Sequence, residues 1–248
     1  MRLTGKTAIV TGGASGFGAG IVRRFLQEGA KVMVADINGQ AAKDFAQEMG
    51  DHAMAQAVDV GDGASVNDMV RAATDAWGHV DILVNNAGVS HMPALMEEVS
   101  EEEFDRVTRV NMKSVYLTAR ALVPHMKERG RGAILNVAST AGVSPRPRLN
   151  WYNASKGWMI TATKAMAVEL APEGIRVNAI NPVAGETPLL KTFMGEDTPE
   201  MRAKFLSTIP IGRFSQPEDM GNAALFLCSD EASMITGVAM EVDGGRCI

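Results

Sequence analysis

The chain is poor in cysteine, has no basic cluster and has no long apolar run, and each shortage excludes a class of protein. Two cysteines, Cys228 and Cys247, make no disulfide framework and have no metal-ligand spacing, so we expect a reducing cytoplasm and no metal site. The formal net charge of −5 argues against nucleic-acid binding. No apolar run approaches the ~20 residues that cross a bilayer, and we expect no signal peptide, because the N-terminus leads straight into an apolar strand.

Short apolar runs alternate with helical patterns over the whole length of the chain. The continuously apolar runs at 7–10 and 31–35 are typical of parallel strands buried on both faces. Further strands are expected at 53–58, 81–84, 132–138, 175–180 and 238–242, and helices near 39–49, 64–77, 100–129 and 152–171. The sequence therefore predicts a single α/β domain over residues 1–248, with a doubly wound parallel sheet of about seven strands and helices on both faces.

Capping residues mark two of the expected helix starts. Ser100, followed three residues later by Glu103, forms a capping-box pattern at the start of the long helix that runs toward Arg129. Ser215, two residues before Pro217, is expected to cap a later helix.

A glycine-rich loop follows the first predicted strand and opens the first helix. Thr11–Gly18 reads Thr-Gly-Gly-Ala-Ser-Gly-Phe-Gly, and glycine lets a backbone turn tightly and approach a pyrophosphate at a helix N-terminus. An ordinary glycine-rich turn has a similar composition. Asp36, at the end of the second strand, favours a dinucleotide, because its carboxylate can bind the hydroxyls of the adenine ribose. A carboxylate there repels a 2′-phosphate, so the sequence favours NAD over NADP.

Tyr152 and Lys156 lie four residues apart in a predicted helix, which places both side chains on one face. A phenol titrates near pH ~10, and a neighbouring ammonium favours its ionised form. We therefore expect Lys156 to lower the pKa of Tyr152 toward the range in which a general acid or base works. The alternative is a surface pair without chemistry.

Taken in order, these residues resemble the short-chain dehydrogenase/reductase family, and the resemblance covers the whole chain. Thr11–Gly18 is similar to the glycine signature of that family, and Asn85-Asn86-Ala87-Gly88 to its motif after the fourth strand. Its catalytic tetrad is matched in identity and order by Asn111, Ser139, Tyr152 and Lys156. One departure is visible, since Pro182 is followed by Val183 where the family often has glycine.

The resemblance implies a Rossmann fold, NAD as cofactor, and Tyr152 as general acid and base. It implies that Lys156 stabilises the tyrosinate and binds the nicotinamide ribose, that Ser139 donates a hydrogen bond to the developing oxyanion, and that Asn111 holds a water. For Ser139 the alternative is a residue that caps a turn, and for Asn111 an exposed helical residue. The implied cofactor contacts are Gly12, Ser15, Gly16, Phe17, Gly18, Asp36, Ile37, Asp59, Val60, Asn86, Ala87, Gly88, Tyr152, Lys156, Pro182 and Thr187.

Candidate substrate contacts follow from the loop between Ser139 and Tyr152. Arg146 and Arg148 on this proline-stiffened loop could bind a carboxylate or sulfonate, or they could be solvent-exposed or intersubunit arginines. His91 and Met92 are further candidates for the pocket wall, and residues 186–210 for a mobile lid over the site.

The resemblance further implies a homotetramer whose partner is a small-molecule substrate. It is strongest to a bacterial subgroup that includes formylbenzenesulfonate and glucose dehydrogenases. We therefore predict an NAD-dependent oxidoreductase that acts on a small alcohol, sugar-like or anionic. Two alternatives stay open: a reductase of 3-oxoacyl thioesters, which Asp36 argues against, and a non-catalytic dinucleotide sensor, which usually lacks the Tyr or the Lys.

Overall fold

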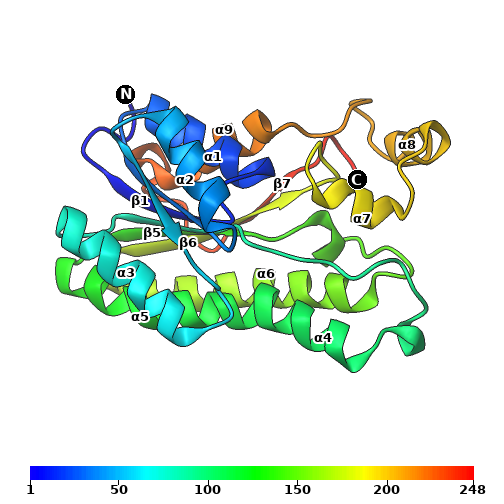
Figure 1. Ribbon diagram of the computed structural model, residues 1–248, viewed down its shortest axis with the longest axis horizontal. Helices are drawn as coiled ribbons and strands as arrows, with labels where there is room; N and C mark the ends of the chain where they lie inside the picture. The colour runs from blue at the N-terminus through cyan, green and yellow to red at the C-terminus, as the bar shows by residue number, and fades with distance from the viewer.

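Seven parallel strands form one sheet in the order β3-β2-β1-β4-β5-β6-β7, in a computed structural model that describes residues 1–248 (Figure 1). The strands are β1 (Thr7–Thr11), β2 (Lys31–Asp36), β3 (Ala53–Ala57), β4 (Ile82–Asn85), β5 (Gly132–Val137), β6 (Ile175–Pro182) and β7 (Ala239–Val242). The chain builds outward from β1 to β3 and then crosses to the other side of β1 with β4. This reversal confirms the predicted doubly wound sheet, and it leaves a crevice beyond the carboxyl ends of the strands.

Helices cover both faces of the sheet (Figure 1). The face drawn uppermost carries α1 (Gly16–Gln27), α2 (Gly39–Met49) and α9 (Pro217–Cys228), and the opposite face carries α3 (Gly63–Trp77), α5 (Ser114–Arg129) and α6 (Asn150–Leu170). Two short helices, α7 (Leu189–Met194) and α8 (Pro199–Leu206), lie to one side, where residues 186–210 pass beyond the sheet. No helix combines the length and apolar character that spanning a bilayer requires.

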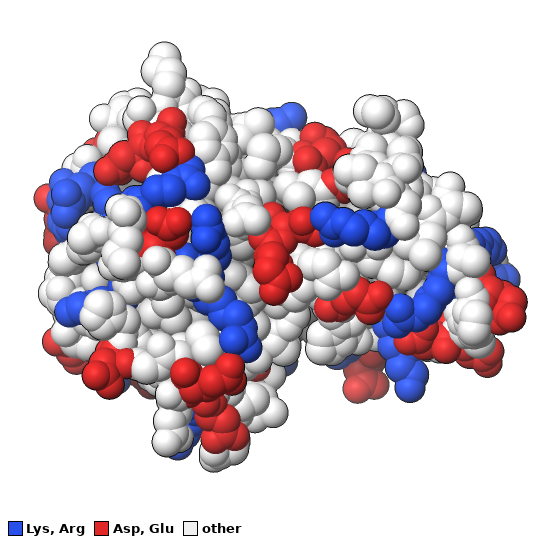
Figure 2. Space-filling model, turned by 90° about the horizontal axis from the view of Figure 1, so that it is seen from above, with Lys and Arg blue, Asp and Glu red and all other residues white.

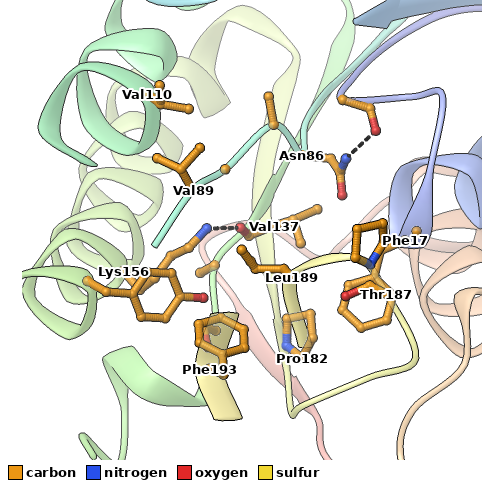
Figure 3. Close-up of a pocket in the computed structure, with 18 of the residues that line it drawn as sticks. Phe17, Asn86, Val89, Val110, Val137, Lys156, Pro182, Thr187, Leu189 and Phe193 are labelled. Atoms are coloured by element: carbon orange, nitrogen blue, oxygen red, sulfur yellow. Dashed lines mark hydrogen bonds between the residues drawn. The ribbon is translucent and has the colours of Figure 1, made fainter. Parts of the chain in front are cut away.

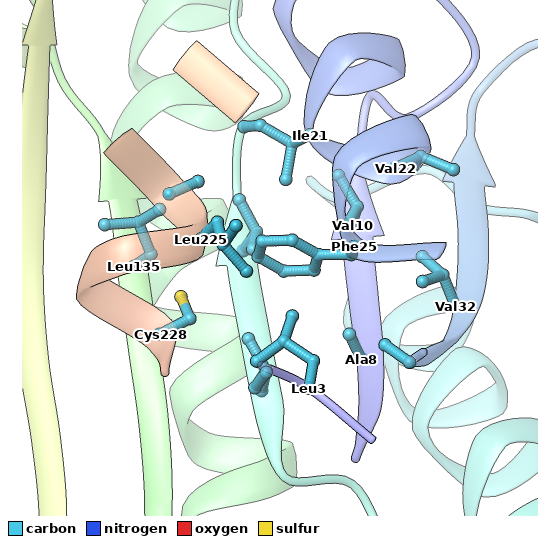
Figure 4. Close-up of a cluster of buried hydrophobic side chains, with 14 of the residues drawn as sticks. Leu3, Ala8, Val10, Ile21, Val22, Phe25, Val32, Leu135, Leu225 and Cys228 are labelled. Carbon is cyan, nitrogen blue, oxygen red and sulfur yellow. The ribbon is translucent and has the colours of Figure 1, made fainter. Parts of the chain in front are cut away.

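Alternate side chains of the strands enter two separate hydrophobic clusters. Ala8 and Val10 of β1 belong to the cluster under α1 and α9, whereas Ile9 belongs to the cluster on the other face. In the first cluster, Phe25 of α1 is fully buried and points toward Leu225 of α9 (Figure 4). Because both faces of β1 are covered, its sequence is apolar at every position between Thr7 and Thr11, as expected for a parallel strand.

The predicted helix over 100–129 is present but irregular. It begins as α4 (Glu101–Thr108), passes through a π-helical turn at Arg109–Lys113 and continues as α5. At its start, the Ser100 hydroxyl accepts a hydrogen bond from the backbone N–H of Glu103 over 3.2 Å. The Glu103 carboxylate pairs with Arg106, so only half of the predicted capping box forms.

The prediction that Ser215 caps α9 was wrong by one residue. Gln216 is the N-cap, and its N–H donates to the carboxylate of Asp219 over 2.8 Å. The Ser215 hydroxyl donates instead to the backbone carbonyl of Val183 over 3.2 Å, which ties this segment to the end of β6. A side chain that has a tertiary acceptor in reach is no longer available for a local cap.

Candidate active site

A cavity of about 560 Å³ opens at the carboxyl ends of the strands, where the reversal in strand order predicts a ligand site. The glycine loop after β1, the end of β2, the turn after β4, the end of β5, the first turns of α6 and the segment after β6 all contribute to its wall (Figure 3). Predicted site residues that line it are Gly12, Ser15, Gly16, Phe17, Asp36, Ile37, Asp59, Val60, Asn86, Ala87, Gly88, Ser139, Tyr152, Lys156, Pro182 and Thr187.

The glycine loop is shaped by close backbone contacts that no side chain could replace. Gly12 has a φ of +61°, and a Cβ built on Gly18 would lie 2.1 Å from the carbonyl oxygen of Gly12. Asn86, after β4, holds the loop from the other side, because its side-chain amide donates to the carbonyls of Thr11 (2.8 Å) and Gly12 (3.0 Å). Gly18 itself does not line the cavity. Its place inside the loop keeps the loop tight.

The start of α1 has the features of an anion site. Ser15 is the N-cap in extended conformation, its hydroxyl makes no capping bond, and the first turn of α1 carries no acidic side chain. Free backbone N–H groups at a helix N-terminus bind phosphate oxygens, and the helix dipole adds to the attraction. Together with the glycine cradle, this donor set fits the pyrophosphate of a dinucleotide.

Asp36 ends β2 at the edge of the cavity, where its carboxylate fixes the turn around it. One oxygen accepts from the backbone N–H of Ala14 over 3.2 Å and the other from that of Asn38 over 3.0 Å. Each carboxylate oxygen keeps a second lone pair, so the group can still accept hydrogen bonds from a ribose diol. Ile37 beside it is 73% exposed and lines the cavity, which suits an apolar contact to a base.

Asp59 is held in place by Arg109, a residue that the sequence did not indicate as part of the site. Its carboxylate accepts from the N–H of Gly61 over 2.9 Å and forms an ion pair with Arg109 over 2.8 Å. Burial by itself raises the pKa of Asp59, but these hydrogen bonds and the Arg109 charge outweigh it and hold the pKa below its usual value. Arg109 belongs to the π-helical turn, 50 residues along the chain, so no local pattern could have revealed the pair.

Tyr152 and Lys156 lie together inside the cavity wall and not on the surface. Both are almost fully buried, and the Lys156 ammonium lies 5.9 Å from the centre of the Tyr152 ring. It donates to the backbone carbonyl of Val137 at the end of β5 over 2.8 Å (Figure 3). The alternative of an exposed pair is therefore wrong.

The expectation that Lys156 lowers the pKa of Tyr152 does not hold in this structure. Burial raises the pKa of Tyr152 to about 12, and the opposing contributions come from the Ser139 hydroxyl and the charge of Arg146. Burial also lowers the pKa of Lys156 to about 8. The correction has one cause: both groups are removed from water, and burial disfavours the charged form of each.

Ser139 fulfils the turn-capping alternative and is still free to act on a ligand. Its hydroxyl oxygen accepts from the backbone N–H of Ala141 over 3.1 Å, at the start of a short 3₁₀ turn (Thr140–Gly142). This bond uses only a lone pair. The hydroxyl proton therefore remains available to donate beside Tyr152.

Asn111 is fully buried behind the cavity, so the alternative of an exposed helical residue is wrong. Its side-chain oxygen accepts from the N–H of Val89 over 2.9 Å, and its amide donates to the Val89 carbonyl (2.9 Å) and to the Ser155 hydroxyl (3.0 Å). The π-helical turn carries this side chain, as π turns often do at functional sites. A Cβ built on Gly88 would lie 3.5 Å from its oxygen and 3.4 Å from the Lys156 ammonium, so both groups converge there.

At the substrate end of the cavity, the two arginines of the 139–151 loop occupy different positions. Arg146 lines the cavity, whereas Arg148 is exposed and does not. His91 is buried outside the lining, and Met92 is 53% exposed, so neither forms the pocket wall that we expected. Phe193 of α7 was missed, although it lies in the predicted lid segment; its ring centre is 5.1 Å from that of Tyr152 (Figure 3).

Known oxidoreductases are similar to this chain over its whole length. Residues 12–246 match the profile of a family described as enoyl-(acyl carrier protein) reductase. The chain is 51% identical to a 4-formylbenzenesulfonate dehydrogenase of Comamonas testosteroni, with 100% of both chains covered. It is 39% identical to a 2,5-dichloro-2,5-cyclohexadiene-1,4-diol dehydrogenase of Sphingobium indicum, with 98% of this chain and 97% of the relative covered.

A crystal structure of similar fold is that of a 3-ketoacyl-(acyl-carrier-protein) reductase from Brucella melitensis in complex with NADH. It superposes with a TM-score of 0.95 at 54% sequence identity and covers 99% of this chain and 100% of its own.

Proposed function

Because the chain belongs to the short-chain dehydrogenase/reductase family, we propose that it is an NAD-dependent oxidoreductase of small alcohols, with Tyr152 as general acid and base. The observation that carries the proposal is a single cavity lined at one end by the glycine loop and Asp36 and at the other by Ser139, Tyr152 and Lys156. A dinucleotide site and an acid–base group thus share one space.

The residues at the cofactor end fit NAD. The free N-terminus of α1 and the glycine loop would hold the pyrophosphate, Asp36 the adenine ribose, and Asp59 and Val60 the adenine surroundings. Lys156, Pro182 and Thr187 would hold the nicotinamide half. The chemistry supplied by bound NAD would be hydride transfer to or from the carbinol carbon.

Proton transfer would be carried out by this chain's own side chains. The phenolic oxygen of Tyr152 takes the hydroxyl proton of the alcohol during oxidation and gives it back during reduction. Ser139 donates its free hydroxyl proton as a hydrogen bond to the substrate oxygen, where negative charge develops. Lys156 places a positive charge behind the tyrosine, and Asn111 positions Val89 and Ser155 around it.

Three finer points belong to the same proposal. Residues 186–210 act as a lid, since α7 and α8 extend past the sheet and Phe193 reaches Tyr152. The enzyme is a homotetramer, supported by exposed apolar side chains on α5 and α6 (Tyr116, Trp158 and Val168). It works in the cytoplasm, supported by two free cysteine thiols.

A second candidate is reduction of 3-oxoacyl thioesters, favoured by the printed name of the Brucella neighbour. One experiment addresses both. Reduced-nicotinamide absorbance is followed with NAD or NADP, a panel of small alcohols, and acetoacetyl thioester in the reverse direction. We expect alcohol oxidation with NAD and none with Tyr152→Phe. Preferred use of NADP by more than about tenfold would contradict the Asp36 assignment, and turnover of the thioester alone would favour the second candidate.

A further inference from the structure

Arg146 is a partly buried cation in the cavity wall without a protein partner for its guanidinium. Its backbone carbonyl accepts from Asn153 over 2.7 Å, but its side chain forms no ion pair and donates no hydrogen bond. Its guanidinium lies 4.6 Å from the ring centre of Phe205 in α8. Burial lowers the pKa of Arg146, and the charge of Arg246 lowers it further. Both effects disfavour the positively charged form of the guanidinium at this position.

Two other arginines of this chain illustrate the partners that account for an arginine's position. Arg176 is also partly buried, and its guanidinium donates to the backbone carbonyls of Leu227, Ser229 and Ile235, as a structural arginine does. At the surface, Arg202 pairs with Glu186 and Asp197. Figure 2 shows the general pattern: basic and acidic side chains are interspersed on the face of the molecule that is seen from above. Arg146 departs from both patterns, since its five N–H donors are left for something that enters the cavity.

A second cation reaches the same loop from the C-terminus. Asp243 fixes the tail by accepting from the backbone N–H groups of Gly245 (2.9 Å) and Cys247 (2.8 Å). This turn brings Arg246 to within 3.4 Å of the Ser144 hydroxyl, two residues from Arg146. The buried Nε of Arg246 has no hydrogen-bond partner. Arg246 does not line the cavity itself, but its charge acts on Arg146 and lowers the pKa of that group.

We propose that Arg146, supported by Arg246, forms an anion subsite, and that the substrate is an alcohol with a carboxylate or sulfonate at its far end. The proposal rests on the function proposed above and names its substrate class. An oxyanion would accept paired hydrogen bonds from the planar guanidinium. Leu149 and Phe193 line the same cavity and pack with Tyr152, and they would supply apolar walls for the spacer between anion and carbinol.

The same guanidinium stacks on Phe205 of α8, so the proposed anion subsite lies against the proposed lid segment.

The test compares two alcohols that differ only in charge, para-(hydroxymethyl)benzoate and para-methylbenzyl alcohol, with NAD. For the native enzyme we expect kcat/KM to be larger for the benzoate by at least about 30-fold, the size of a charge-assisted pair of hydrogen bonds. Arg146→Gln also removes a positive charge that lowers the pKa of Tyr152, an effect that both alcohols share. Beyond that shared change, it should lower kcat/KM for the benzoate by at least about 30-fold more than for the neutral alcohol. Arg146→Lys, which keeps the charge but loses the planar fork, should retain part of the advantage of the benzoate, and Arg246→Gln should lose a smaller part.

Arg148→Gln is the matched control, since that arginine lies on the same loop but outside the cavity and should leave both substrates unaffected. Equal losses for the charged and the neutral alcohol in Arg146→Gln, or no preference for the benzoate in the native enzyme, would overturn the anion subsite while leaving the dehydrogenase proposal intact.

A binding measurement separates the two proposals and does not need turnover. Benzenesulfonate, which has no hydroxyl to oxidise, should raise the melting temperature of the native protein and of Arg148→Gln but not of Arg146→Gln. If this pattern appears while no alcohol is oxidised, the anion subsite stands and the proposed function fails. If benzenesulfonate stabilises all variants alike, the subsite is not at Arg146.

Discussion

The ammonium of Lys156 donates a hydrogen bond to the backbone carbonyl of Val137 over 2.8 Å, and the side chain is almost fully buried in the cavity wall. Helix α6 is thereby tied to the end of β5, two residues before Ser139. The cost of this arrangement is a buried charge, and burial lowers the pKa of Lys156 from 10.5 to about 8. That shift makes the folding stability depend on pH in a defined window.

Between about pH 8 and pH 10, the free energy of unfolding of the native protein should increase with pH when it is compared with that of Lys156→Met. In this window the unfolded lysine binds a proton and the folded one does not, so the free energy of unfolding increases with pH. The difference between the two proteins should change by about 2 kcal/mol across it. Chemical denaturation at several pH values measures it, and because the cysteines are shared by both proteins their titration cancels. A constant difference would contradict burial of a charged Lys156.

Tyr152→Phe should lose at least about a hundredfold to ten-thousandfold in kcat, the usual contribution of a general acid or base. Its ring still packs on Phe193, so stability should change little. Affinity for NAD should also stay near the native value, which titration by intrinsic fluorescence would check. Turnover close to native would remove Tyr152 from the proposed mechanism.

Asp36→Asn should weaken discrimination against NADP. The amide oxygen still accepts one backbone hydrogen bond, either from Ala14 or from Asn38, so the turn is largely kept. The negative charge that repels a 2′-phosphate is lost, and we expect the ratio of kcat/KM for NAD to that for NADP to fall by about tenfold or more. An unchanged ratio would mean that another residue selects the cofactor.

Gly18→Ala should disrupt the glycine loop, because the new Cβ would lie 2.1 Å from the Gly12 carbonyl oxygen. The backbone must move, so we expect a stability loss of about 1–3 kcal/mol and a large rise in the Kd for NAD. Gly157→Ala is the control for a helical glycine: its Cβ would meet the nearest atom at 3.7 Å, an ordinary contact. That variant should be as stable as the native protein or more so, by up to about 1 kcal/mol. Equal behaviour of the two would contradict the tight loop.

Asn111→Leu should lower stability by several kcal/mol and reduce kcat more than it changes KM. The substitution leaves the N–H and carbonyl of Val89 without partners in a buried place. Asn111→Asp restores the acceptor for the N–H alone and should recover part of the stability. Comparison of kcat with KM matters here, since a residue with only a structural role would reduce the amount of folded enzyme without altering kcat per folded molecule.

Much of the fold was readable from sequence because its signals are local. Continuous apolar runs indicated strands buried on both faces, and β1 and β2 begin at the expected residues. The glycine spacing after β1 and the acidic residue at the end of β2 depend on backbone sterics and charge, which a few adjacent residues decide. The lid helices α7 and α8 were not predicted as helices, since short segments with glycine and proline give no clear period.

Only the tertiary structure decided how the site residues behave. Arg146 and Arg148 are the same residue type and lie two positions apart on one loop. Arg146 nevertheless lines the cavity, whereas Arg148 is exposed to solvent. The pKa of Tyr152 is raised because distant segments close over it, and the π-helical turn buries Asn111 against Val89. Burial and electrostatic environment sum over contacts between segments far apart in the chain. A local sequence pattern therefore identifies which chemical groups are present. The packing of the whole domain determines how they are protonated and what they can contact.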